Sequence, residues 1–265
     1  MSNIIIDKFK CVRCGQCILA CPARVFVRNS PMESTLISAG GSDRCIACNH
    51  CIAICPVNAI SINGIDGTDC EPMFVGVHPR LEHIISLVQM RRSIRSYSDE
   101  PVTQDQLEQL LNAVRWSPTA RNHLSVNWLV INGRDKVHEL AGLVIDWFRC
   151  LKGVDEMLEA WDRGIDPIFR GAPCVVAAYT SAEATWGTVD CTIAIQTFDY
   201  CATAMRLGTC WAGYFIHVAQ KESKINKWLG LSRDETVYAS LMLGNIGGEF
   251  YQKVPPRPDV NVKWI

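Results

Sequence analysis

Two cysteine runs of identical spacing constrain this chain more than any other feature of its sequence. The first run spans Cys11–Pro22 and the second spans Cys45–Pro56. Both read C-x2-C-x2-C-x3-C-P, and every matched position is offset by 34 residues. This spacing is the bacterial iron–sulfur signature. Because it occurs twice, the sequence predicts a small module built around iron–sulfur clusters.

Cysteine thiolates are the ligands of iron–sulfur clusters, and in two-cluster proteins the fourth cysteine of each run binds the cluster of the other run. The sequence therefore predicts two [4Fe–4S] clusters with crossed ligand sets. The first set is Cys11, Cys14, Cys17 and Cys55. The second set is Cys45, Cys48, Cys51 and Cys21.

Structural zinc and disulfides are the alternative uses of these cysteines. Structural zinc usually takes two separated ligand pairs, which two four-cysteine runs ending in proline fit poorly. Three closely spaced thiols on one loop suit a metal better than pairing. The segment resembles a two-cluster bacterial-type ferredoxin over residues 1–64, with a somewhat long stretch, Ala23–Arg44, between the runs.

The composition excludes several partner classes. The 265 residues carry a formal net charge of −1, so no strong nucleic-acid or membrane interaction is expected. The sequence contains no run of 18 apolar residues, so no membrane-spanning helix is expected. The amino-terminal residues do not have the pattern of a signal peptide. Six cysteines outside the runs mostly lie in apolar stretches, where free cysteine behaves as a small hydrophobe. These features predict a cytoplasmic location.

The patterning divides the chain into three parts. Residues 1–64 form the cluster module, with short strands at Ile4–Asp7 and Ile60–Ile62. Residues 65–80 are expected to be a linker, since Gly67, Pro72, Gly76 and Pro79 interrupt any pattern. Residues 81–265 form a second domain that is long enough to bury a substantial core.

Helices and strands are interleaved in the second domain without strict β-α-β order. A capping box at Thr103 and Gln106 opens one helix. The other predicted helices are Leu81–Val88, Val137–Leu151, Val189–Leu207 with Gly208 as C-cap, and Lys224–Leu229. The predicted strands are Val126–Ile131, Cys174–Tyr179, Cys210–His217 and Thr236–Leu243. With no G-x-G-x-x-G for a Rossmann site, this order indicates an α+β domain.

Four motifs of the second domain together point to a site for a terminal phosphate. Arg91-Arg92-Ser93-x-Arg95 offers guanidinium forks and a hydroxyl, which suit a terminal phosphate. Ser117–Asn122 is a compact turn that exposes backbone donors. Cys210–Tyr214 contains Gly213, which permits close backbone approach, and Pro255-Pro256-Arg257 lies in the tail.

In order along the chain these motifs resemble the nitroreductase family of FMN flavoproteins, from about Leu81 to the end. The Ala172-Pro173 start of a strand, the long Asp190–Gly208 helix and the Leu-Gly-Asn near 245 also occur in the family's order. The resemblance implies a homodimer with one FMN at each end of the subunit interface. The chain departs from the family at Leu124-Ser125, where Gln-Pro is usual.

The resemblance also implies roles for single residues. Phosphate and ribityl contacts would come from Arg91, Arg92, Ser93, Arg95 and Arg257. Pro118, Thr119 and Ala120 would approach the flavin ring from the neighbouring subunit, with Asn122 stabilising their turn. Ala212 and Gly213 would present backbone N–H groups to flavin N5. No protein side chain is expected to act as a catalytic acid or base.

Together the two parts predict an iron–sulfur flavoprotein oxidoreductase. Clusters move single electrons, whereas a flavin accepts electrons singly and delivers two as a hydride. Electrons would pass from a low-potential donor, such as a ferredoxin, through the clusters to FMN and then to a nitroaromatic or quinone. Two alternatives stay open: FMN reduced directly by NAD(P)H with the clusters exporting electrons, and a relay protein without catalysis.

Overall fold

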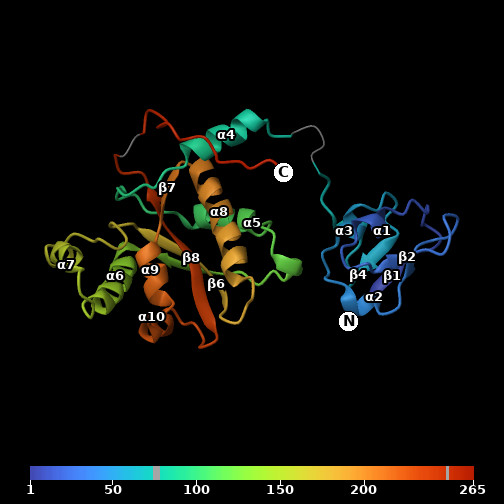
Figure 1. Cartoon of the computed structure of the whole chain (residues 1–265), viewed down its shortest axis with the longest axis horizontal. Coiled ribbons are helices and arrows are strands. Elements are labelled where there is room, and N and C mark those ends of the chain that lie inside the picture. The colour runs from blue at the N-terminus through green and yellow to red at the C-terminus, as the bar shows by residue number, and fades with distance from the viewer. Residues whose placement is uncertain (74–77, 249–250) are drawn as a thin grey trace. The chain divides into compact units, whose positions relative to one another are not determined.

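The computed structural model describes residues 1–73, 78–248 and 251–265 (Figure 1). The chain forms two compact units. The first comprises Met1–His78 together with Arg121–His123, and the second comprises Pro79–Ala120 and Leu124–Ile265. The boundary between His78 and Pro79 falls within the predicted linker, whose Gly76 lies outside the described residues.

The first unit is built around a small antiparallel pair of strands. Strand β1 (Ile4–Ile6) pairs with β4 (Ile60–Ile62), with Ile4 opposite Ile62. A hairpin of β2 (Phe26–Val27) and β3 (Leu36–Ile37) occupies the long stretch between the cysteine runs. The short helices are α1 (Gln16–Ala20), α2 (Gly41–Arg44) and α3 (His50–Ala53), followed by the 3₁₀ turn η1 (Gly67–Asp69).

The helices α1 and α3 carry the third cysteine of each run into the core of this unit. Cys17 and Cys51 are buried there with Ile52, Val25 and Phe26. The remaining buried members of the core are Ile4, Ile60 and Ile62. Each cysteine-rich loop is therefore anchored in the apolar core by its third cysteine.

The second unit contains, within the described residues, a four-stranded antiparallel sheet of order β5-β6-β8-β7. The strands are β5 (Asn127–Asn132), β6 (Cys174–Ser181), β7 (Leu207–Trp211) and β8 (Glu235–Asn245). A parallel bridge from Ser93 to Thr209 joins the Arg91–Arg95 segment to β7. This bridge positions the segment beside the sheet, and the Ile94 N–H donates to the Thr209 carbonyl at 2.8 Å.

Helices cover both faces of this sheet (Figure 1). One core packs α5 (Gln104–Val114) and α8 (Gly187–Ala204) against the sheet. The other core is formed by α6 (Arg134–Phe148), α9 (Gly213–Ala219) and α10 (Ser223–Trp228). Alternate residues of β6 belong to the two cores, which is why this strand is one continuous apolar run. The remaining elements are α4 (Leu81–Met90), η2 (Ala120–Asn122) and α7 (Asp155–Asp162).

Most predicted elements are confirmed with boundaries shifted by a few residues. The capping box is present, since Thr103 Oγ1 accepts from the Gln106 N–H and the Gln106 side chain accepts from the Thr103 N–H. The α+β class is confirmed for the second unit. The helix at α7 and the hairpin of β2 and β3 were not predicted, because both lie in stretches without a clear apolar period.

Two predictions near the carboxyl end of α8 were wrong. The strand predicted over Cys210–His217 ends at Trp211, and a helix follows from Gly213. A short apolar run fits either element, and here burial of Phe215, Val218 and Ala219 selects the helix. Gly208 is not a helix C-cap but lies within β7, where an added Cβ would come within 2.8 Å of Ile94 Cγ2.

Candidate functional site

The two cysteine loops share one backbone geometry as well as one spacing. Arg13 and Ala47, 34 residues apart, both adopt left-handed conformations with φ of 62° and 48°. Gly15 and Asn49 do the same at φ 76° and 58°. Left-handed residues at matched positions turn the chain in the same way around each loop. The internal repeat is therefore a repeat of structure, which extends beyond the cysteines.

Backbone donors reach the fourth cysteine of each run in the same way. The Val25 N–H lies 3.3 Å from Cys21 Sγ, and the Ala59 N–H lies 3.2 Å from Cys55 Sγ. Such hydrogen bonds stabilise negative charge on sulfur and are one of the features that set cluster potentials. Both loops thus hold their last sulfur in a conformation suited to a thiolate ligand.

The first predicted ligand set converges on one cavity of the first unit. This cavity is lined by Cys11, Cys14 and Cys17 from the first run and by Cys55 from the second. The rest of its lining is mainly apolar: Ile6, Val12, Gly15, Gln16, Thr35, Val57, Ala59 and Ile60. Four thiols around a largely apolar cavity, with the fourth crossing from the other run, are the donor set a [4Fe–4S] cluster requires.

The second predicted set is also held together. Burial first, and then the neighbouring sulfurs of Cys48, Cys21 and Cys45, together raise the pKa of the Cys51 thiol to about 12. These four are the members of the second set. Among the described residues, no three Cys, His, Asp or Glu side chains are placed to hold a single metal ion. A cubane differs in binding each thiolate through a separate iron atom.

Thr35 of the β2–β3 hairpin lies against the first ligand set. Its hydroxyl is 3.4 Å from Cys17 Sγ, and the residue is almost fully buried. Burial alone would raise the pKa of Cys11, but backbone donors of Thr35 and Arg13, with the Ser34 and Thr35 hydroxyls, outweigh it and lower that pKa. The unpredicted hairpin therefore supplies polar contacts to two of the four cysteines.

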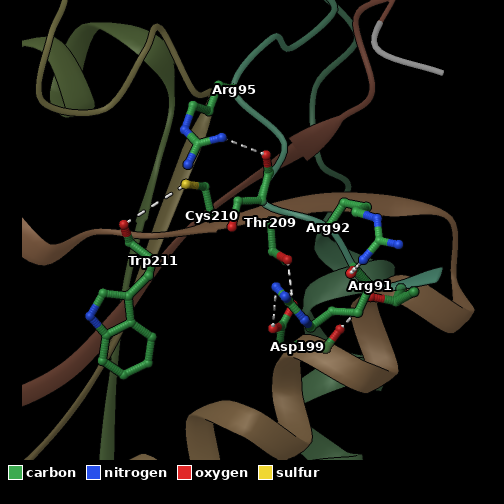
Figure 2. A network of polar contacts seen from close by, with 9 residues as sticks. Arg91, Arg92, Arg95, Asp199, Thr209, Cys210 and Trp211 are labelled. Atoms are coloured by element: carbon green, nitrogen blue, oxygen red, sulfur yellow. Dashed lines mark hydrogen bonds and ion pairs between the residues drawn. The ribbon is translucent and has the colours of Figure 1, made fainter. Parts of the chain in front are cut away.

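In the second unit, Arg91 and Thr209 both reach the buried carboxylate of Asp199 (Figure 2). Arg91 Nη1 is 3.6 Å from Asp199 Oδ2, and the Thr209 hydroxyl donates to Oδ1. Burial raises the pKa of Asp199, while the Thr209 hydrogen bond and the Arg91 charge oppose the shift. Asp199 thus ties the first arginine of the motif to helix α8 and strand β7.

The other arginines of the motif point elsewhere (Figure 2). Arg92 Nη1 donates to the Arg91 carbonyl at 3.2 Å, and Arg95 Nη1 donates to the Ser93 carbonyl at 3.2 Å. Burial raises the pKa of the Cys210 thiol, and the nearby Arg95 charge opposes that shift. Three guanidinium groups and the Ser93 hydroxyl thus lie on one short segment, a donor set that fits a phosphate.

The Pro118–Ala120 turn is tied to helix α8 by a second buried aspartate. The Ala120 N–H donates to Asp190 Oδ1 at 2.9 Å, and Thr119 Oγ1 accepts from the Leu124 N–H at 2.9 Å. Pro118 is exposed. Asn122 belongs to the first unit, where its amide donates to the carbonyl groups of Ile46 and Ala47 at 3.3 Å.

The remaining predicted flavin residues lie in two places. The Ala212 N–H already donates to the Ser240 carbonyl at 3.0 Å, so in this conformation it does not point at a ligand. Gly213 is the first residue of α9, where backbone N–H groups have no partner within the helix. Arg257 lies in the exposed tail and is not part of the network of Figure 2.

Comparison with known families decides what the second unit is. The model of the nitroreductase family matches residues 88–245. The chain belongs to the nitroreductase family. A second family model, described as a 4Fe–4S dicluster domain, matches residues 3–56. The predicted fusion, the assignment to an oxidoreductase family and the FMN and iron–sulfur cofactors are therefore confirmed at the level of these families.

Solved nitroreductase structures share the fold of the second unit. A nitroreductase with bound FMN from Bacteroides fragilis aligns with a TM-score of 0.59 and 20% identity, over 69% of this chain and 98% of its own. One with bound FMN from Desulfitobacterium hafniense aligns with a TM-score of 0.57 and 21% identity, over 68% and 97%. At 20% and 21% identity, these similarities show only that the second unit of this nitroreductase-family chain shares the fold.

A curated relative extends the comparison to sequence. A Bacillus subtilis protein named FMN reductase [NAD(P)H] is 38% identical over 65 residues. That match covers 23% of this chain and only 26% of the relative. In the described residues of this family member, no helix is both long enough and apolar enough to cross a bilayer.

Three functional candidates of this nitroreductase-family chain were missed from the sequence. Asp190 and Asp199 are the acidic residues of an otherwise mostly apolar helix, α8, and both are buried. Two acidic residues within a mostly apolar predicted helix were a usable signal, because a carboxylate that such a helix buries needs a partner. Thr35 offered none, because only the fold of the hairpin brings it to Cys17.

Proposed function

We propose that this protein reduces a small organic acceptor at FMN with electrons delivered through two [4Fe–4S] clusters. Residues 1–64 hold the clusters, residues 81–265 hold the flavin, and residues 65–80 are the linker between these two parts. The observation that carries the proposal is the convergence of Cys11, Cys14, Cys17 and Cys55 on one cavity in a chain that also belongs to a flavoenzyme family.

The cluster ligands follow from the two sets described above. Cys11, Cys14, Cys17 and Cys55 hold one cluster, and Cys45, Cys48, Cys51 and Cys21 hold the other. Cys21→Ser and Cys55→Ser test this crossed assignment. Each is expected to lower the iron content by about half, and Cys55→Ser should abolish the same spectroscopic signal as Cys11→Ser. Loss of the Cys45 signal in Cys55→Ser would overturn the crossed arrangement.

The flavin phosphate is assigned to the Arg91–Arg95 segment. Arg91, held by Asp199, together with Arg92, Ser93 and Arg95 provides charged and hydroxyl donors, with Arg257 as a further cation from the tail. The Pro118–Ala120 turn, fixed by Asp190, would lie against the flavin ring of the neighbouring subunit. Asn122 is not assigned to this turn, because its amide donates to the carbonyl groups of Ile46 and Ala47. Gly213, the first residue of α9, lies at the proposed N5 edge. Ala212 adjoins it, but the Ala212 N–H donates to the Ser240 carbonyl and is not assigned to N5.

When bound, FMN can accept electrons singly and donate two as a hydride, to an acceptor such as a nitroaromatic or a quinone. The chain's own role is to hold the phosphate, orient the ring and hydrogen-bond its edge. The test is anaerobic turnover with nitrofurazone or menadione while a reduced ferredoxin supplies electrons. Turnover that stops when the clusters are removed is the expected result. No turnover with any small acceptor would favour the relay function.

A homodimer is part of the proposal. Helix α4 has no buried residue, and its apolar side chains Leu81, Ile84, Ile85, Val88 and Met90 are exposed. Exposed apolar residues gathered on one helix mark an interaction surface. Sedimentation of the native protein should give twice the chain mass, and Ile84→Asp together with Val88→Asp should shift it toward one chain.

Direct reduction by NAD(P)H is the second candidate, because a relative with 38% identity over a short segment is named FMN reductase [NAD(P)H]. Anaerobic stopped-flow separates the two directions of electron flow. Rapid flavin bleaching by NADH or NADPH, followed by slower bleaching of the clusters, would support it. Reduction of the flavin only through the clusters would exclude it.

A further inference from the structure

Cys14, one of the four cysteines of the first ligand set, lies at the surface of the first unit. Of the eight cysteines in the two runs, all of them described, Cys14 is the one whose side chain is exposed. The others are buried or half-buried. A cluster held by this set would therefore lie closest to solvent at Cys14. An external redox protein can approach the cluster most closely at that point.

The surface around Cys14 is apolar at its centre. A shallow groove beside Cys14 is lined by Gly15, Ile18, Leu19, Val27 and Arg28. The side chains of Leu19 and Val12 are 83% and 57% exposed. We call the surface formed by Val12, Arg13, Cys14, Leu19, Val27 and Arg28 the Cys14 face. An exposed apolar patch of this kind indicates a protein contact rather than a solvated loop.

Basic side chains flank this apolar centre. Arg28 Nη1 donates to the Arg13 carbonyl at 3.1 Å, and it lies 3.2 Å from where a Cβ on Gly15 would be. The Arg28 guanidinium is therefore held over the cysteine loop. Both Arg13 and Arg28 are exposed.

The charged side chains of the cluster module, with its cysteines counted as neutral, have the same sign. Residues 1–64 carry six Lys and Arg against three Asp and Glu, a formal charge of +3, whereas the whole chain carries −1. One of the three acids, Asp7, lies 3.9 Å from Lys10. Bound clusters and their thiolates would add negative charge to the module, so the positive charge that favours an acidic partner is the local charge of Arg13 and Arg28 at the Cys14 face.

We propose that the Cys14 face is the docking surface for an acidic one-electron carrier protein. The inference rests on the proposed function, since it assumes a cluster held by Cys11, Cys14, Cys17 and Cys55. One electron leaves the reduced carrier and enters this cluster, and no bond forms or breaks. Opposite charges steer the encounter, while the apolar centre excludes water at the contact.

The test uses the reconstituted holoprotein without any organic acceptor. A reduced acidic bacterial ferredoxin is mixed anaerobically with the protein, and cluster bleaching is followed by stopped-flow. Arg13→Glu reverses one charge of the face, and Leu19→Glu places a charge at its centre. Lys136→Glu, at an exposed position of α6 in the other unit, is the control for net charge. Dithionite, a small reductant, is used in parallel.

The second-order rate constant with ferredoxin is expected to fall tenfold or more in Arg13→Glu and Leu19→Glu, and to stay unchanged in Lys136→Glu. It should also fall with rising salt in the native protein, while reduction by dithionite and iron content stay constant. Native rates in both face variants with full iron content would overturn the proposal. A native rate that does not fall with salt would also overturn it, whether or not the variants assemble.

Failure of the proposed function gives a different result. In that case dithionite would reduce the clusters of the native protein, but no organic acceptor would be turned over. The docking measurement records the clusters alone, so its outcome does not depend on the flavin.

Discussion

Arg91 Nη1 lies 3.6 Å from Asp199 Oδ2, and this ion pair joins the segment after α4 to the carboxyl-terminal half of helix α8. The Asp199 side chain is 7% exposed, and that of Arg91 is 30% exposed. A buried carboxylate restricts the guanidinium to a small range of orientations, and the Thr209 hydroxyl on β7 restricts the carboxylate in turn. The first basic residue of the proposed phosphate site is thus oriented by the fold itself.

Replacing the arginines of this segment should remove the flavin and spare the clusters. A hydrogen bond to a charged group contributes about 1.5–3 kcal/mol, so Arg91→Ala and Arg95→Ala should each weaken FMN binding roughly 10- to 150-fold. FMN titration and iron content measure the two cofactors separately. Arg115→Ala, an exposed arginine at the end of α5, is the control. Full FMN occupancy in both variants would show that the phosphate site is misplaced.

The raised pKa of Asp199 predicts a pH dependence of stability. Burial raises this pKa above its unfolded value, despite the Thr209 hydrogen bond and Arg91. The protonated carboxyl therefore contributes stability that is full below the unfolded pKa, about 3.9, and is lost as pH rises through the folded value. Asp199→Asn has no carboxyl group to lose this stability. Its Tm relative to the native protein should therefore rise as the pH increases from the unfolded pKa through the folded pKa of Asp199.

Thermal unfolding at a series of pH values measures this difference. Asp259→Asn, in the exposed tail, is the matched control and should show a constant small difference. A Tm difference for Asp199→Asn that does not change with pH would mean that the carboxylate is fully compensated by Arg91 and Thr209.

The Thr35 hydroxyl should tune the cluster held by the first ligand set. An iron-bound Cys17 is a thiolate, so the only proton between Cys17 Sγ and Thr35 Oγ1 belongs to threonine, which must donate. Losing a hydrogen bond of about 1 kcal/mol corresponds to roughly 40 mV for one electron. Thr35→Val should make the potential more negative by that order, whereas Thr35→Ser keeps the donor.

Potentiometric titration followed by electron paramagnetic resonance reads this potential directly. Iron content confirms that the valine variant still assembles its clusters. Equal potentials in the valine and serine variants would show that the hydroxyl does not donate to the cluster ligand.

Gly247 should tolerate no side chain. A Cβ on Gly247 would lie 2.4 Å from the carbonyl carbon of Tyr97. The Gly247 N–H donates to the Ser96 carbonyl at 2.9 Å. Overpacking against backbone typically costs about 1–3 kcal/mol, so Gly247→Ala should lower the Tm. Gly142→Ala in α6, where the nearest atom lies 3.7 Å away, should be neutral or stabilising. Equal Tm values would contradict the close approach of these two segments.

Local patterns in the sequence determined the modules and most of their elements. The 34-residue offset of the cysteine runs identifies the cluster loops because ligand spacing is a property of one short stretch of chain. The capping box at Thr103 and the apolar run of β6 succeed for the same reason. Each depends on neighbours only a few residues away, which a single sequence displays.

Only the tertiary structure decided what depends on distant contacts. Gly208 resembles a helix end in the sequence, yet it lies in β7, paired with Gly244 of β8. Ile94 occupies the space that a side chain at this position would need. Tyr214–Val218 fits a strand or a helix equally, and burial in the core under α6 selected the helix. Asp199 meets Arg91, and Thr35 meets Cys17, through packing between separate elements. Contacts between residues so far apart in the sequence produce no periodic pattern. They form only when the folded chain brings the separate elements together.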